Sequence, residues 1–123
     1  MTTTPVVATG VVVCRYDALL PERGVAALVD GRQIALFRTH DGAVLALDNR
    51  DPFSGANVLS RGIVGSRGDV PTVASPMYKQ VFDLRTGTCL DEPGVSVTAH
   101  PVRVVDGVVE VSVAHGNEGA VDV

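Results

Sequence analysis

Several residue types are scarce in this chain of 123 residues, which has no tryptophan, two cysteines and a single lysine beside nine arginines. The formal net charge is −4, so the chain lacks the basic stripe that binds nucleic acid or an anionic membrane surface. No apolar run approaches the roughly 20 residues that span a bilayer, and the N-terminus lacks the basic start and apolar stretch of a signal peptide. We therefore expect a cytoplasmic protein without nucleic-acid or membrane partners.

The cysteines and histidines form no pattern typical of a metal site. Cys14 and Cys89 stand in no C-x-x-C or C-x-H arrangement. A disulfide between them is not expected in a reducing compartment, and both are interpreted as small, partly buried residues. The three histidines, His40, His100 and His115, are interpreted as surface or loop residues. No metal site is therefore predicted on this chain.

Strand signals are dense, and four glycine-containing turns separate short apolar runs. The chain is 46% hydrophobic and rich in valine, which packs well on pleated sheets. Asp-Gly pairs are strong hairpin signals, because the type I′ turn needs positive φ at both central residues. The turns are predicted at Asp30-Gly31, Asp41-Gly42, Thr86-Gly87 and Asp106-Gly107. This pattern predicts an all-β antiparallel sandwich or small barrel.

The predicted domain organisation is simple. One domain over residues 9–113 is expected, preceded by a flexible N-terminus (1–8) and followed by a loose C-terminal tail (114–123). The segment Asp48–Pro71 interrupts the strand rhythm, since it is rich in glycine and polar residues and shows no clear strand character. Long segments of this kind inside a compact domain are usually functional.

Two loops carry most of the information about function. The first, residues 49–56, reads Asn-Arg-Asp-Pro-Phe-Ser-Gly-Ala. The second, residues 75–87, reads Ser-Pro-Met-Tyr-Lys-Gln-Val-Phe-Asp-Leu-Arg-Thr-Gly. We call them box 1 and box 2. Asp51 and Asp83 are interpreted as acceptors that order these loops and not as an acid–base pair.

The two boxes resemble those of Rieske iron–sulfur domains, which read C-x-H-x-G-A and C-P-x-H-G-x-x-F-D-x-x-T-G. Pro52, Gly55-Ala56, Pro76, Phe82-Asp83 and Thr86-Gly87 match the frame. The positions of the four cluster ligands are occupied by Asp51, Phe53, Ser75 and Tyr78. The resemblance implies a Rieske-like antiparallel fold whose two boxes form a degenerate cluster-binding tip.

The residues at the ligand positions argue against a bound cluster. A Rieske centre needs two thiolates on one iron and two imidazoles on the other. Phe53 offers no donor atom, and the hydroxyls of Ser75 and Tyr78 are poor ligands for an iron–sulfur cluster. We expect no cofactor on this chain, and we expect the rings of Phe53 and Tyr78 to fill the space between the loops.

Among Rieske-like families, the chain is most similar to the small subunit of assimilatory NAD(P)H-dependent nitrite reductase, which lacks the cluster ligands. That resemblance implies a partner, the large subunit, which carries FAD, a [4Fe–4S] cluster and sirohaem and reduces nitrite to ammonium. The alternative is a cluster-free Rieske-fold interaction module of another oxidoreductase complex. A cluster-bearing ferredoxin of the ring-hydroxylating type is a third possibility.

No catalytic residue is predicted on this chain, because it has neither a nucleotide-binding glycine motif nor a histidine paired with a nucleophile. Its role would then be to bind and support the large subunit. The exposed tip formed by the boxes mixes aromatic, methionine and basic side chains, which are enriched at protein interfaces. The predicted partner surface consists of Arg50, Phe53, Met77, Tyr78 and Lys79.

Overall fold

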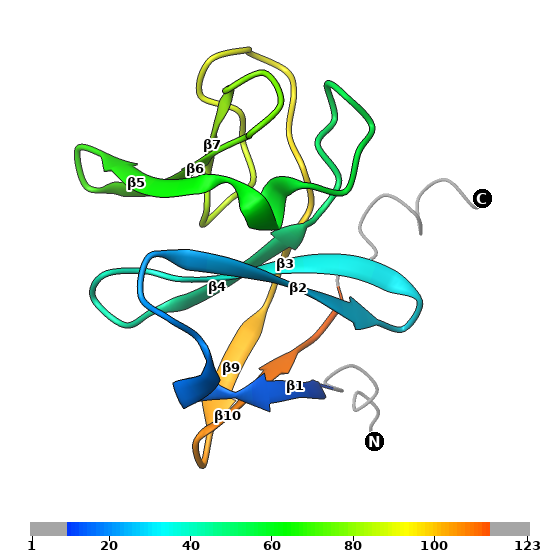
Figure 1. The fold of residues 1–123 in the computed structure, drawn as a ribbon, viewed down its shortest axis with the longest axis vertical. Helices are drawn as coiled ribbons and strands as arrows, with labels where there is room; N and C mark the ends of the chain where they lie inside the picture. Colours follow the sequence, from blue (N-terminus) through cyan, green and yellow to red (C-terminus); the bar gives the residue numbers. More distant parts are fainter. Residues whose placement is uncertain (1–9, 114–123) are drawn as a thin grey trace, which may run out of the picture.

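The computed structural model describes residues 10–113, which form three antiparallel sheets stacked along the long axis of the molecule (Figure 1). The central sheet has the order β2-β3-β4-β8, one outer sheet has the order β5-β6-β7, and the other has the order β1-β10-β9. The strands are β1 (Val11–Arg15), β2 (Arg23–Val29), β3 (Arg32–Arg38), β4 (Val44–Asp48), β5 (Ile63–Arg67), β6 (Val70–Ala74), β7 (Val81–Asp83), β8 (Ala99–His100), β9 (Val102–Val105) and β10 (Val108–Val111). The all-β antiparallel prediction is confirmed. Residues 1–8 and 114–123, predicted to be loose, lie outside the described residues.

Two of the four predicted glycine turns have the expected type I′ geometry. Asp30 and Gly31 have φ of 52° and 78°, and Asp106 and Gly107 have φ of 51° and 79°. These pairs join β2 to β3 and β9 to β10 without a bulge. At Asp41-Gly42 and Thr86-Gly87 only the glycine has positive φ, so these pairs belong to longer loops. After the Thr86-Gly87 turn, Thr88 and Cys89 make only isolated bridges, to Ser96 and Phe82.

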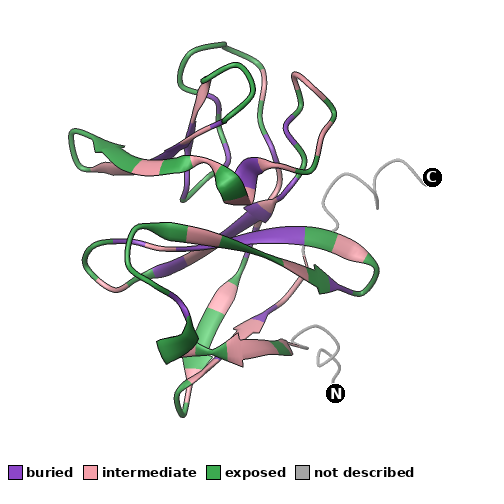
Figure 2. Ribbon diagram, viewed as in Figure 1, coloured by how far each residue is buried: buried purple, intermediate pink, exposed green. Residues whose placement is uncertain are grey.

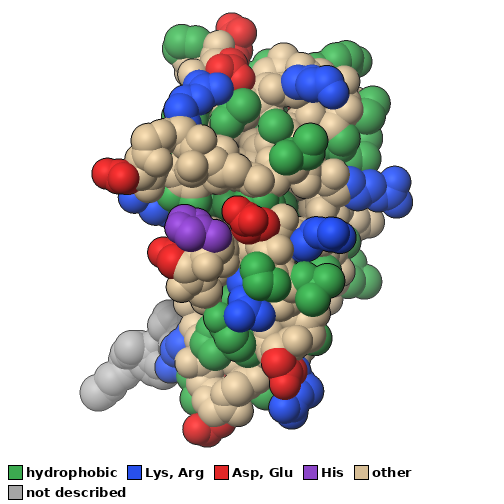
Figure 3. Space-filling model, turned by 60° about the vertical axis from the view of Figure 1, so that its left-hand side comes forward, with side chains coloured by type: hydrophobic (Ala, Val, Ile, Leu, Met, Phe, Trp, Pro, Cys, Tyr) green, Lys and Arg blue, Asp and Glu red, His purple; other side chains and the backbone are tan. Residues whose placement is uncertain are grey.

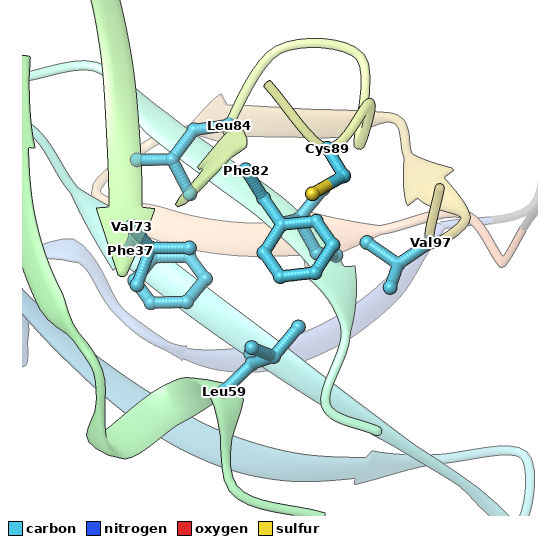
Figure 4. Packing of buried hydrophobic residues seen from close by; sticks show 9 residues of the cluster. Phe37, Leu59, Val73, Phe82, Leu84, Cys89 and Val97 are labelled. Atoms are coloured by element: carbon cyan, nitrogen blue, oxygen red, sulfur yellow. The ribbon is translucent and has the colours of Figure 1, made fainter. Parts of the chain in front are cut away.

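The central sheet is covered on both faces, because alternate side chains of β3 and β4 point to opposite sides. On one face Ile34 and Leu36 pack with Val109 and Val111 of the β1-β10-β9 sheet. The opposite face packs against the β5-β6-β7 sheet and its loops in a second buried cluster (Figure 4). That cluster contains Ala35, Phe37, Leu47, Leu59, Val73, Phe82, Leu84, Cys89 and Val97. Figure 2 shows the buried residues concentrated along the central strands and on the inner sides of the loops.

The prediction that residues 48–71 lack strand character is wrong for their second half. Residues 63–74 form the β5–β6 hairpin, which closes through Gly68 and Asp69. Gly68 has φ of 64°, the conformation that the first central residue of a type II′ turn requires. A short 3₁₀ helix, η3 (Leu59–Arg61), precedes the hairpin and packs against β2. The Gly-Asp pair between valine-containing runs was the signal for this hairpin.

The described part of the chain contains no helix long and apolar enough to cross a membrane.

Both cysteines are free, as predicted, with Cys14 partly exposed and Cys89 buried in the cluster around Phe82. Burial raises the pKa of the Cys14 thiol. The fold therefore rests on two apolar clusters without a disulfide staple, as a domain of this size allows.

Candidate functional site

Box 1 is a tight loop organised around Asp51, whose side chain is fully buried. The backbone N–H of Asp51 donates to the carbonyl of Ala56 (2.8 Å), and the Asp51 carbonyl accepts from the N–H of Gly55 (2.8 Å). Its carboxylate oxygen Oδ1 accepts from the N–H of Phe53 (2.8 Å). The interpretation of Asp51 as a loop-ordering acceptor is confirmed.

Box 2 is organised in the same way around Ser75, which is 1% exposed. The Ser75 hydroxyl donates to Oδ2 of Asp51 at 2.5 Å and accepts from the backbone N–H of Met77 at 3.2 Å. One buried, charge-assisted hydrogen bond therefore joins the two boxes at the positions where a Rieske domain has its two cysteines. The structure brings together two of the four degenerate ligand positions.

The two aromatic residues at the remaining ligand positions behave differently. Phe53 is partly buried and packs against the core, with its ring centroid 6.3 Å from that of Phe82. Tyr78 is 58% exposed. The prediction that both rings fill the space between the loops is therefore right for Phe53 and wrong for Tyr78. The Asp51–Ser75 hydrogen bond already closes the loops against each other, so the second ring is left on the surface.

The donor set does not fit a Rieske cluster. The carboxylate of Asp51 and the hydroxyl of Ser75 are committed to each other and to backbone N–H groups. Phe53 has no donor atom, and the exposed Tyr78 supplies a phenol where an imidazole is needed. Among residues 10–113, no group of three or more histidine, cysteine, aspartate or glutamate side chains is placed to hold a metal ion.

A buried asparagine fixes the start of box 1 to the central sheet. The Asn49 side chain is 1% exposed. Its Nδ2 donates to Gln33 Oε1 and to the Asn57 carbonyl, both at 3.2 Å, and its Oδ1 accepts from the Ser60 N–H at 2.7 Å. Asn49 thus ties both ends of the loop to β3 and η3. Its place inside box 1 was visible in the sequence, but its structural role was not.

A partly buried network of charged side chains is centred on Asp48, the residue before Asn49. His100 Nε2 is 2.7 Å from Asp48 Oδ1, and the Arg32 guanidinium donates to both carboxylate oxygens of Asp48 at 3.0 and 3.1 Å. Burial raises the pKa of Asp48, but the hydrogen bonds from His100 and Arg32 outweigh it and hold that pKa below its ordinary value. The interpretation of His100 as a surface or loop residue is wrong, because it is 4% exposed and joins β8 to β4. His40 is exposed as predicted, and His115 lies outside the described residues.

Four of the five residues predicted to form the partner surface are exposed. Met77 is 47% exposed, and Arg50, Tyr78 and Lys79 are also exposed. Phe53 is only partly exposed, since its ring packs inward. Because the Asp51–Ser75 hydrogen bond joins the two boxes, their exposed residues share one end of the molecule, at the top of Figure 1. We call the exposed residues Arg50, Met77, Tyr78 and Lys79 the tip.

A cleft of about 560 Å³ lies between the β3–β4 turn and the β5–β6 hairpin. Leu45 and Val64 are among its apolar lining residues, and His40 and Asp41 lie at its polar rim. A hydrogen bond from the Thr39 hydroxyl lowers the pKa of Asp41. Figure 3 shows a histidine and acidic side chains beside this hollow. The sequence did not indicate the cleft, because its lining residues come from four separate segments.

The fold and the two boxes define a class of protein. Residues 10–112 match the family model of the Rieske-like [2Fe-2S] domain, and the chain belongs to that family. The protein is a member in which a hydrogen bond between Asp51 and Ser75 stands where the cluster's thiolate ligands would be.

Relatives of known name narrow this class further. The chain is 44% identical over 99 residues to the nitrite reductase (NADH) small subunit of Salmonella typhimurium, which is 80% of this chain and 92% of that protein. A crystal structure from Mycobacterium tuberculosis, assigned as an NADH-dependent nitrite reductase small subunit, has a TM-score of 0.83 and 52% identity, covering 86% of this chain and 96% of that one. The chain therefore belongs to the nitrite reductase small-subunit family, as the boxes predicted.

One further relative is a large subunit. The nitrite reductase [NAD(P)H] large subunit of Klebsiella oxytoca is 48% identical to this chain over 95 residues. The match covers 77% of this chain but only 10% of the Klebsiella protein. A segment similar to this domain is thus present within a much longer large-subunit chain.

Proposed function

We propose that this chain is the non-catalytic small subunit of a cytoplasmic NAD(P)H-dependent nitrite reductase. Its partner is the large subunit, which would hold FAD, a [4Fe–4S] cluster and sirohaem and reduce nitrite to ammonium. The chain itself would carry no cofactor and would support the large subunit through protein contacts.

The buried hydrogen bond between Asp51 and Ser75 is the observation that carries this proposal. A Rieske tip that transfers electrons depends on its cluster both for chemistry and for holding the two boxes together. Here the Asp51–Ser75 hydrogen bond, together with the packing of Phe53 on Phe82, holds the two boxes together but provides no redox chemistry. The shape of the tip is therefore kept while its redox chemistry is absent, which fits a binding role.

The match within the Klebsiella large subunit supports the choice of partner. Two domains that occur in one chain in one organism and in separate chains in another commonly form a complex in both. This argues for a nitrite reductase large subunit as the partner and against an unrelated oxidoreductase. The tip is the proposed contact surface, because Tyr78 and Met77 expose large side chains there and such residues often carry binding energy.

A nitrite-reduction assay with the purified large subunit tests the proposal. Adding the chain should raise NAD(P)H oxidation that depends on nitrite, and Tyr78→Ala should weaken this effect about tenfold at limiting concentrations of the chain. Val104→Ala is the matched control, because Val104 is 45% exposed on β9, in the outer sheet at the opposite end of the molecule from the tip (Figure 1). If the chain neither binds the large subunit nor changes its activity, the proposed function is wrong. If both variants act like the wild type, the tip is not the contact surface.

A further inference from the structure

Box 1 and the first half of box 2, residues 75–80, share their hydrogen-bond frame with a third loop, residues 83–88, which begins within box 2. In each loop, the side chain of the first residue accepts a hydrogen bond from the backbone N–H two positions later. The carbonyl of the same residue accepts a hydrogen bond from the N–H four positions later. Its own N–H donates to the carbonyl five positions later. The first residues are Asp51, Ser75 and Asp83, and these nine hydrogen bonds measure 2.7–3.2 Å. Three copies of one loop therefore allow a comparison within a single chain.

The fifth residue of this frame has a left-handed backbone in all three loops. Gly55 has φ of 79° and Gly87 has φ of 82°. The equivalent residue of box 2 is Lys79, with φ of 65°. Glycine adopts this conformation freely, whereas a side chain with a Cβ atom crowds the backbone there. Lysine at position 79 therefore costs stability that glycine at the same position would not.

Nothing in the described part of the chain compensates Lys79 for this strain. The side chain is exposed, and residues 10–113 provide no hydrogen bond or ion pair to its ammonium group. Strained residues of this kind concentrate at functional sites, where another demand outweighs the cost. The backbone of Lys79 makes the hydrogen bond that the frame requires, through its N–H to the Ser75 carbonyl. Glycine could make the same backbone bond, so the reason for a lysine here must be a contact of its side chain.

The charges around Lys79 indicate what its side chain meets. The charged residues of residues 49–57 and 75–80 are Arg50, Asp51 and Lys79. Asp51 is 0% exposed and bonded to Ser75, so both exposed charges of the two loops are positive. Lys79 directly follows Met77 and Tyr78 in the chain, and Arg50 directly precedes Asp51, whose hydrogen bond to Ser75 joins the two loops. The whole chain, in contrast, has a net charge of −4. The tip is thus a small basic and aromatic surface on an acidic protein.

We propose that Lys79 is retained in its strained position because its ammonium, together with Arg50, binds an acidic surface of the nitrite reductase large subunit. This inference rests on the proposed function and adds to it the chemistry of the partner's contact surface. Charges at the rim of an interface mainly increase the rate of association and weaken as salt rises. Lys79 accordingly lowers the stability of the free subunit but favours its binding to the large subunit.

The variant Lys79→Gly tests this trade, because it should move stability and binding in opposite directions. We expect the melting temperature of the isolated chain to rise by about 4 °C, since glycine relieves the strain. We expect the Kd for the purified large subunit to increase about fivefold at low ionic strength, with the difference shrinking at high salt. Lys79→Arg is the matched control, because it keeps both the charge and the strain and should leave both quantities close to those of the wild type.

The outcomes separate this inference from the proposed function. If Lys79→Gly is more stable but binds the large subunit as tightly as the wild type at low salt, Lys79 has no role in recognition. If Lys79→Gly melts at or below the wild-type temperature, the strain argument is wrong. If the wild-type chain fails to bind the large subunit at all, the proposed function fails, and this inference fails with it.

Discussion

The hydrogen bond between Asp51 and Ser75 predicts a strong energetic coupling between the two boxes. Ser75→Ala removes the donor and leaves Oδ2 of a fully buried carboxylate without its partner. A hydrogen bond to a charged group contributes roughly 1.5–3 kcal/mol, and an unsatisfied buried acceptor adds its own desolvation cost. Ser75 also loses its bond from the Met77 N–H. We therefore expect Ser75→Ala to lower the free energy of unfolding by about 3 kcal/mol.

Asp51→Ala should cost about as much, because it removes both the bond to Ser75 and the acceptor of the Phe53 N–H. The double variant leaves no carboxylate buried without a partner, so its loss should fall short of the sum of the two single losses. The shortfall measures the coupling between the residues, which we expect to be about 2 kcal/mol.

Urea denaturation of the four proteins, followed by circular dichroism, measures this coupling. A domain of this size is expected to unfold in one cooperative step, so that the four free energies can be compared. Additive losses, agreeing within about 0.5 kcal/mol, would show that the two boxes are not joined by this bond. That result would remove the physical basis for a tip held together without a cluster.

Two further predictions concern parts of the frame around the boxes. In the same urea assay, Gly87→Ala should destabilise the chain by about 3 kcal/mol, because an added Cβ would lie 2.0 Å from the Val97 carbonyl oxygen. Gly55→Ala should cost only about 1 kcal/mol, because the added Cβ would meet only the flexible side chain of Arg50, at 3.4 Å. Equal losses for the two variants would contradict this prediction. The folded-state pKa of Asp48 is lowered, so its ionised form stabilises the fold above the unfolded pKa near 3.9, and this stability is lost as the pH falls through the folded pKa. Thermal melts should therefore show the wild type losing stability more steeply than Asp48→Asn below about pH 4, and parallel curves would refute the role of this carboxylate.

Sequence patterns predicted the parts of the fold that depend on local chemistry. Asp30-Gly31 and Asp106-Gly107 form the predicted type I′ turns because the demand for positive φ acts on the turn residues themselves. The boxes were recognisable for a similar reason. Their prolines and glycines, and Asp83, shape the loop backbone directly, whatever occupies the ligand positions.

Features that depend on distant partners were missed or misassigned. His100 lies on a two-residue strand, and its burial follows from Asp48, which is 52 residues away in the chain. Tyr78 was expected to point inward, but the hydrogen bond between Asp51 and Ser75 brings the two loops together without it. These two residues are 24 positions apart in the chain, so their contact could not be predicted locally. The sequence shows a lysine at position 79 where the Rieske box has glycine, but the left-handed backbone of Lys79 is seen only in the structure. No periodicity or turn motif reports contacts of this range.

Nitrite reduction by the large subunit together with an iron-free preparation of this chain tests the central claim most directly. The chain is stripped of metal with a chelator, and a second sample is then treated anaerobically with ferrous iron and sulfide. We predict that both samples raise the activity of the large subunit equally, and that neither contains stoichiometric iron and acid-labile sulfide on this chain. An effect that appears only in the treated sample, with two iron atoms and two sulfides per chain, would contradict the account.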